Sequence, residues 1–103
     1  MARKTLMRLV RQGRKRGSAR GFVVTWDIDS RDRRAVDRVR HFVFGLRVQA
    51  HGRTYEYEGF VFRPGVRYLA QSALFVRPDL RGEICAFLAA LGVDYEAMPA
   101  TIG

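Results

Sequence analysis

Alternating apolar and polar positions predict a β-strand at residues 21–29. Every second residue from Phe22 to Trp26 is apolar, and β-branched residues lie between them. A period of two, with apolar side chains on both faces, is typical of a central strand of a sheet. The strand ends at Asp29 and Ser30, and we expect Asp29 to cap the helix that follows.

Helical spacing of apolar residues predicts two amphipathic helices. The first covers residues 31–46 and ends near Gly45, and the second covers residues 80–92 and ends at Gly92. Apolar side chains recur every three or four residues in both segments, which is the stripe that a helix buries against a core. Glycine directly after such a stripe is a common helix stop.

The sequence between these two helices predicts a loop followed by a β-hairpin. Residues 47–53 are polar and predict the loop. Residues 54–62 alternate as a strand until Gly59, where the phase slips and indicates a β-bulge. Pro and Gly within residues 63–66 predict a type II turn, and residues 67–76 then form the returning strand.

A last strand is predicted at residues 93–102 and is weakened at its end by Pro99. The order strand, helix, hairpin, helix, strand predicts an α+β fold on the ferredoxin-like βαββαβ plan. In that plan the sheet is antiparallel, its first and third strands are central, and both helices cover one face. The other face stays open for a nucleic acid or for the second subunit of a homodimer.

Positive charge is concentrated at the N-terminus. The 103 residues include 19 Lys and Arg against 10 Asp and Glu, a net charge of +9. Residues 1–20 contain no acid and contribute +8, whereas residues 21–103 contribute +1. We therefore predict a basic nucleic-acid-binding arm, 1–20, and a nearly neutral domain, 21–103. The cations of the arm are Arg3, Lys4, Arg8, Arg11, Arg14, Lys15, Arg16 and Arg20.

The composition excludes several classes of protein. A chain of 103 residues forms a single domain, and its single cysteine, Cys85, excludes an internal disulfide. One cysteine and two distant histidines cannot form a structural zinc site. No stretch approaches 18 apolar residues, and residues 1–20 lack the apolar segment of a secretory signal. We therefore expect a cytoplasmic protein with no membrane partner.

Uncompensated cations predict a nucleic-acid partner, because they release counterions from phosphates when they bind. On the first predicted helix, Arg31, Arg34 and Arg38 recur at i, i+3 and i+7 and extend the basic surface. Two alternatives stay open: an ordinary solvated helix face, and an organellar transit peptide in place of the arm. The charge layout is similar to that of small ribosomal proteins, which favours RNA over DNA.

Aromatic residues of the predicted hairpin are candidates for stacking on bases, although about half of them must supply core. The sequence EYEGFVF lacks the signature of the RNA recognition motif. The aromatic residues are Tyr55, Tyr57, Phe60 and Phe62.

Few residues point to catalysis. The sequence has no Gly-rich phosphate loop, no nucleophile elbow and no Cys–His pair at a recognisable spacing. His41 and His51 are expected at the surface. Asp27, at the end of the first strand, is a candidate ligand for a divalent metal if a dimer brings a second copy alongside.

Two short segments resemble the small CRISPR-associated adaptation nucleases, the ferredoxin-like dimers that accompany the integrase. VVTWDIDSRDRR is similar to the first strand and polar turn of that family. RYLAQSALF is similar to a later strand, with Gln71, Ser72 and Phe75 at the matching positions. The resemblance implies that Asp27 is a metal-binding acid, with Mg or Mn as the cofactor. The chain departs from the family in its basic arm and in Trp26, where the family has tyrosine.

The sequence thus predicts a non-enzymatic RNA-binding protein without a cofactor, a component of a ribosome or of another ribonucleoprotein particle. Its arm and helix arginines would bind phosphates. The alternative is a metal-dependent nuclease or integrase-complex subunit of the CRISPR-associated type that uses Asp27. A third hypothesis is a dimeric scaffold or regulatory module.

Overall fold

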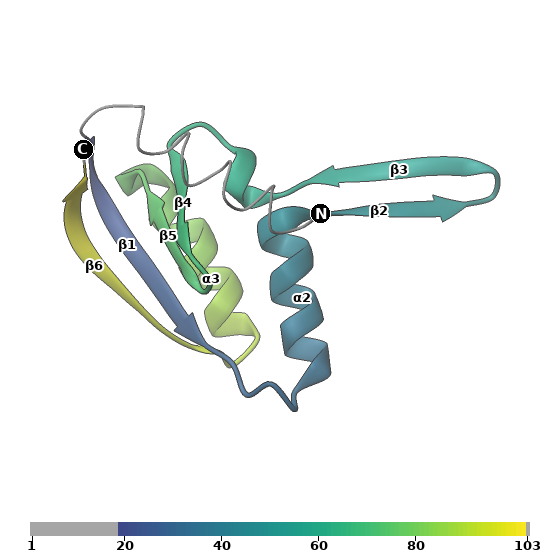
Figure 1. Ribbon diagram of the computed structural model, residues 1–103, viewed down its shortest axis with the longest axis horizontal. Coiled ribbons are helices and arrows are strands. Elements are labelled where there is room, and N and C mark those ends of the chain that lie inside the picture. The colour runs from purple at the N-terminus through teal and green to yellow at the C-terminus, as the bar shows by residue number, and fades with distance from the viewer. Residues whose placement is uncertain (1–18, 103) are drawn as a thin grey trace.

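The computed structural model describes residues 19–102, which form an α+β fold (Figure 1). Within these residues the fold has two α-helices, a four-stranded antiparallel sheet and a separate two-stranded hairpin. In chain order the elements are β1 (Ala19–Asp27), α2 (Arg33–Phe44), β2 (Gly45–Ala50), β3 (Arg53–Glu58), the 3₁₀ turn η1 (Phe60–Phe62), β4 (Val66–Ala70), β5 (Ala73–Val76), the 3₁₀ turn η2 (Pro78–Leu80), α3 (Arg81–Ala90) and β6 (Asp94–Ile102).

The sheet is built around β1, and its strand order is β4-β5-β1-β6. β1 pairs with β6 along its whole length, from Ala19 opposite Ile102 to Asp27 opposite Asp94. Its other edge pairs with β5, and every neighbouring pair is antiparallel. Because β1 begins at Ala19, the arm cation Arg20 lies within the sheet.

Both helices pack against the same face of this sheet. Val24 of β1 lies opposite Leu74 of β5, and both side chains are fully buried. Val39 of α2 and Ile84 of α3 belong to the same buried cluster. The predicted helices are therefore confirmed, and their apolar stripes form one core with the sheet.

Phe75 lies outside this core cluster, on the opposite face of the sheet. Its neighbours Leu74 and Val76 point toward the helices, so alternation along β5 directs Phe75 away from them. The ring lies over Gly21, where an added Cβ would come within 2.7 Å of Phe75 Cζ. Phe75 is only 1% exposed, so this aromatic ring is not a free stacking surface.

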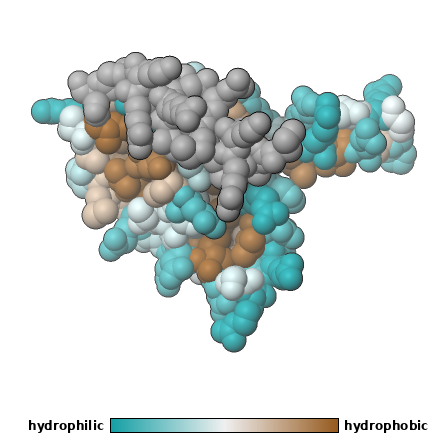
Figure 2. Space-filling model, viewed as in Figure 1, coloured by the Kyte–Doolittle hydropathy of each residue, from teal (hydrophilic) through white to brown (hydrophobic). Residues whose placement is uncertain are grey.

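Residues 47–53, predicted as a loop, instead contribute to a hairpin that projects from the body (Figures 1 and 2). β2 and β3 pair from Gly45 opposite Glu58 to a two-residue connection at His51 and Gly52. The φ angles of these two residues are 53° and 73°. Positive φ at both positions is the requirement of a type I′ turn, which matches the twist of the flanking strands.

The predicted hairpin of residues 54–62 with residues 67–76 is also wrong. Residues 67–76 do not form one strand: β4 and β5 are joined by a tight turn in which Ser72 has a φ of 63°. The chain after β3 forms the 3₁₀ turn η1 instead of a longer strand. The turn at residues 63–66 is present, and Gly65 has the positive φ of 89° that a type II turn requires.

Gly59 marks a close backbone approach, where a β-bulge was predicted. A Cβ at Gly59 would meet the backbone of Val43 and Phe44 and would lie 2.6 Å from the Gly45 backbone nitrogen. Gly45 itself ends α2, as predicted, with a φ of 95°. The two glycines therefore bring the base of the hairpin directly against the end of α2.

The N-terminal cap of α2 differs from the prediction. Asp32 caps the helix, because its Oδ1 accepts a hydrogen bond from the Ala35 backbone nitrogen at 3.1 Å. The carboxylate of Asp29, the predicted cap, accepts hydrogen bonds from Arg31 instead.

Candidate nucleic-acid interface

Most cations of the predicted arm lie outside the described residues, so their role stays a prediction. Arg20, the last of them, lies in β1 with an exposed side chain. The arm residues outside residues 19–102 are Arg3, Lys4, Arg8, Arg11, Arg14, Lys15 and Arg16.

Arg31 lies before α2 and is held by Asp29. Its Nε and Nη2 donate to the two carboxylate oxygens at 3.1 and 2.9 Å, and its backbone nitrogen also donates to Oδ1. These bonds lower the pKa of Asp29 and raise that of Arg31. Arg31 precedes the first residue of α2 and does not line the groove that Arg34 and Arg38 line, so its contact with phosphate stays a prediction.

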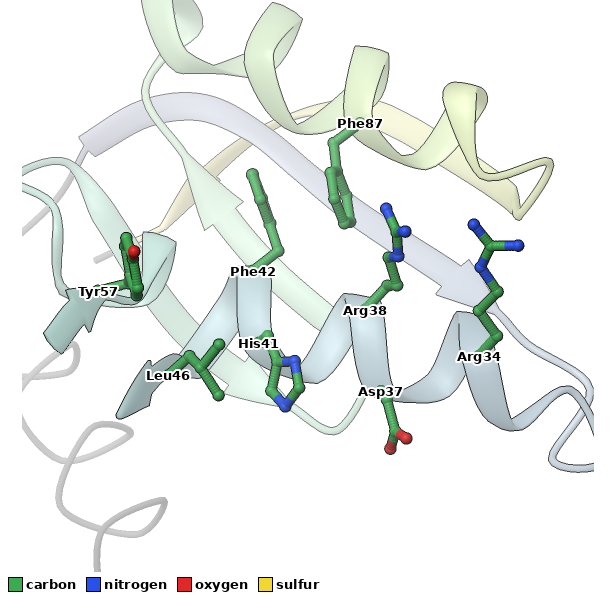
Figure 3. A pocket seen from close by; sticks show the side chains of 8 residues that line it. All are labelled: Arg34, Asp37, Arg38, His41, Phe42, Leu46, Tyr57 and Phe87. Carbon is green, nitrogen blue, oxygen red and sulfur yellow. The ribbon is translucent and has the colours of Figure 1, made fainter. Parts of the chain in front are cut away.

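Arg34 and Arg38 line an open groove of about 530 Å³ beside α2 (Figure 3). They are one turn apart on the helix, and both project toward the side on which α3 lies. Asp37 and His41 also line the groove but point away from α3 in the same view. The groove therefore has a cationic wall.

Aromatic rings form the floor of this groove. Phe42 of α2 stacks on Phe87 of α3, with ring centroids 4.0 Å apart and an angle of 11° between the planes. Phe42 also stacks on Phe60, at 5.1 Å between centroids. Three chain segments thus meet in one aromatic column, which holds α2 against α3 at the groove.

The base of the hairpin closes one end of the groove. Leu46 of β2 and Tyr57 of β3 line it, and they lie opposite each other in the hairpin. Tyr57 was predicted from the sequence as a candidate for base stacking, but its place in this groove was not, because the β2–β3 pairing was not predicted. Phe87 was predicted only as part of the apolar stripe of the second helix, and its stacking on Phe42 was not predicted.

Arg34 and Arg38 form no ion pair with any of residues 19–102. Other arginines in this part of the chain do have acidic partners. The pairs are Arg31–Asp29 at 2.9 Å, Arg47–Glu56 at 2.9 Å, Arg77–Asp79 at 2.8 Å, and Arg63–Glu83. The Arg77 guanidinium lowers the pKa of Asp79 in the same way as Arg31 lowers that of Asp29. Because Arg34 and Arg38 have no such acidic partner among the described residues, they are available to bind an external anion.

The candidate metal ligand Asp27 is exposed at the end of β1, directly opposite Asp94 of β6. Directly opposed carboxylates repel each other. Among residues 19–102, no group of three or more His, Cys, Asp or Glu side chains is placed to hold a metal ion. The described residues therefore do not supply a complete ligand set around Asp27.

None of the helices between Ala19 and Ile102 is long and apolar enough to cross a membrane. No protein-family model, curated protein or solved structure matches this chain.

Proposed function

We propose that this protein binds RNA without cleaving it, as a component of a ribosome or of another ribonucleoprotein particle. The observation that carries the proposal is the pair of arginines in the groove. Arg34 and Arg38 are exposed, have no acidic partner within the described chain, and stand beside an aromatic floor. This combination of cations and aromatic surface suits a phosphate backbone that carries bases.

The two arginines are positioned for successive contacts with one polyanion. They project from the same side of α2, and helix residues four apart are neighbours on its surface. The guanidinium group binds phosphate through two parallel hydrogen bonds, which is a stronger contact than a surface ion pair offers. The groove is thus a phosphate-binding site on the body, to which the cations of residues 1–18 would add affinity.

A binding measurement on the full chain tests this function. The double variant Arg34→Gln/Arg38→Gln removes the two groove cations, and Arg33→Gln/Arg40→Gln removes two exposed cations of the same helix that do not line the groove. At about 0.1 M salt, we expect the first variant to bind a single-stranded RNA about ten-fold more weakly. The affinity of the matched control for the same RNA should fall by about two-fold or less.

Equal losses in both double variants would show that net charge alone matters and would contradict a groove site. DNA of the same sequence serves as the second probe, because RNA contacts through the 2′-hydroxyl would favour the RNA strand. Absence of RNA binding by the unmodified protein would overturn the proposal as a whole.

A metal-dependent nuclease is the second candidate function. The observation that favours it is the exposed position of Asp27 opposite Asp94. Because the described residues supply no third ligand, we derive no metal-dependent step from them. Incubation of RNA and duplex DNA with magnesium or manganese tests this function. Cleavage that is lost in Asp27→Asn but kept in Asp29→Asn would support the nuclease over the non-enzymatic proposal.

We also infer a ferredoxin-like plan for the body. Counted in chain order, the strands of the sheet are β1, β4, β5 and β6, and the first and third of them occupy the central positions. The two helices pack on one face, as that plan requires. The β2–β3 hairpin is then an insertion between the first helix and the second strand of the sheet.

A further inference from the structure

The β2–β3 hairpin separates its side chains into two chemically different faces. One face carries Tyr55 and Tyr57 with their cross-strand partners Val48 and Leu46. Arg53, at the outer end of the hairpin, lies on this face as well, because strand residues two apart share a face. None of these residues is acidic.

The acids of the hairpin lie on its other face. Glu56 and Glu58 alternate with the two tyrosines along β3, so they point to the opposite side. Glu56 pairs there with Arg47 at 2.9 Å. The tyrosine face is therefore apolar and aromatic with a cationic end, and the opposite face holds the negative charge.

The tyrosine face has exposed rings. Tyr57 is 61% exposed and Tyr55 is 43% exposed. Figure 2 shows hydrophobic residues gathered along one side of the projecting hairpin. A two-stranded hairpin that stands alone is only marginally stable in water, so a partner on this face would stabilise it.

The face is continuous with the arginine groove. Leu46 and Tyr57 belong both to the tyrosine face and to the groove that Arg34 and Arg38 line. A nucleic-acid strand that runs from the groove along the hairpin would meet Arg34 and Arg38 first. It would then meet the rings of the two tyrosines and, at the outer end of the hairpin, Arg53. Asp37 is the one acid among the residues that line the groove, and it points away from α3, whereas Arg34 and Arg38 project toward α3. Cations that flank aromatic rings match a polyanion that carries flat bases.

We propose that Tyr55 and Tyr57 form a stacking platform for the bases of single-stranded RNA. This inference rests on the proposed function and specifies its substrate as unpaired RNA. Residues two apart on a strand are separated by about 6.7 Å, so the two rings have room for separate bases of an extended strand. Paired bases in a duplex do not offer their flat faces to such rings.

The test uses the full-length protein with two RNA probes of equal length. One is a single-stranded RNA, and the other has the same sugar–phosphate backbone with abasic positions in place of the bases. The variant Tyr55→Ile/Tyr57→Ile replaces the aromatic rings with β-branched side chains, which also favour a strand. Tyr55→Phe/Tyr57→Phe keeps the rings and serves as the matched control.

We expect the isoleucine variant to bind the single-stranded RNA at least about ten-fold more weakly than the unmodified protein. Its binding to the abasic probe and its salt dependence should not change, because the phosphate contacts remain. The phenylalanine variant should bind within about two-fold of the unmodified protein, since a ring alone is sufficient for stacking. Circular dichroism and urea unfolding verify that each variant is folded.

The outcomes separate this inference from the proposed function. If the isoleucine variant binds single-stranded RNA normally while Arg34→Gln/Arg38→Gln weakens binding, the stacking platform is wrong and the phosphate groove stands. Sedimentation of the protein without RNA tests whether this face joins two copies of the chain. If the unmodified protein is a dimer and the isoleucine substitutions dissociate it, the tyrosine face is a dimer interface and the stacking platform is wrong. Failure of the unmodified protein to bind either probe would overturn both proposals.

Discussion

The ring of Phe42 stacks on the ring of Phe87 at 4.0 Å between centroids, so a single aromatic contact joins α2 to α3. The same contact forms the floor beside Arg34 and Arg38. Packing between the helices and the shape of the groove therefore depend on the same two side chains.

A double-mutant cycle measures this contact. Because both rings are half-buried, we expect Phe42→Ala and Phe87→Ala each to lower the free energy of unfolding by about 2 kcal/mol, less than for fully buried rings. The double variant should lose less than the sum of the two, with a coupling of about 0.5–1.5 kcal/mol, because either substitution alone already removes the stack. Additive losses in urea unfolding would show that the rings do not interact.

Gly59 and Gly82 make a matched pair of glycine-to-alanine tests. A Cβ at Gly59 would collide with the backbone at the end of α2, whereas no atom within 4 Å opposes a Cβ at Gly82, inside α3. We expect Gly59→Ala to lower the free energy of unfolding by about 1–3 kcal/mol. Gly82→Ala should raise it by about 0.5–1 kcal/mol, through better helix propensity. A neutral Gly59→Ala would rule out the close approach between hairpin and helix.

The cap of α2 is tested by removing each nearby aspartate in turn. Asp32 accepts the hydrogen bond from Ala35, so Asp32→Ala should lower the free energy of unfolding by about 1 kcal/mol. Asp29→Ala removes an exposed ion pair with Arg31 and an exposed hydrogen bond from the Arg31 backbone nitrogen, and such surface contacts contribute little. Thermal unfolding should therefore rank Asp32→Ala as the less stable variant, and the reverse order would restore Asp29 as the cap.

The burial of the Tyr68 phenol predicts that the protein loses stability at high pH. Burial raises the pKa of its phenol above the ordinary value of 10.0. The unfolded chain then releases this proton at a lower pH than the folded chain does. The corresponding stability is present below about pH 10 and is lost as the pH rises through the pKa of the folded state.

The variant Tyr68→Phe removes this titration. As the pH rises above about 9, the free energy of unfolding should fall further in the unmodified protein than in the variant. Burial also raises the pKa of the Cys85 thiol, but Cys85 is present in both proteins and its contribution cancels. Parallel curves for the two proteins would contradict a buried Tyr68 phenol.

Strong local periodicity made part of the fold predictable from the sequence. The alternation from Phe22 to Trp26 and the helical stripes of α2 and α3 each depend on residues close in the chain. β6 was also predicted, and it is an edge strand, the position in a sheet where Pro99 is tolerated.

The two hairpins could not be predicted, because their turns use unusual residues. A type I′ turn usually contains Asn-Gly or Asp-Gly, and here His51 occupies the first position. Ser72 adopts a positive φ that is uncommon for residues other than glycine, so the sequence around it predicted a continuous strand.

The candidate site was predicted only in part. The cationic wall was accessible from the sequence, because Arg34 and Arg38 follow helical spacing. The floor and the closed end were not, because Phe87 and Tyr57 come from α3 and β3 and reach the groove only through tertiary packing. Pairing of Arg31 with Asp29 also depends on side-chain geometry that spacing does not reveal.

The most direct test of phosphate binding at the groove is the salt dependence of RNA affinity. Each contact with a single-stranded phosphate contributes about 0.7 to the slope of log affinity against log salt concentration. We predict that Arg34→Gln/Arg38→Gln makes this slope about 1.4 less negative than in the unmodified protein, while Arg33→Gln/Arg40→Gln leaves it nearly unchanged. An unchanged slope in the groove variant, or the same change in both variants, would contradict phosphate binding by Arg34 and Arg38.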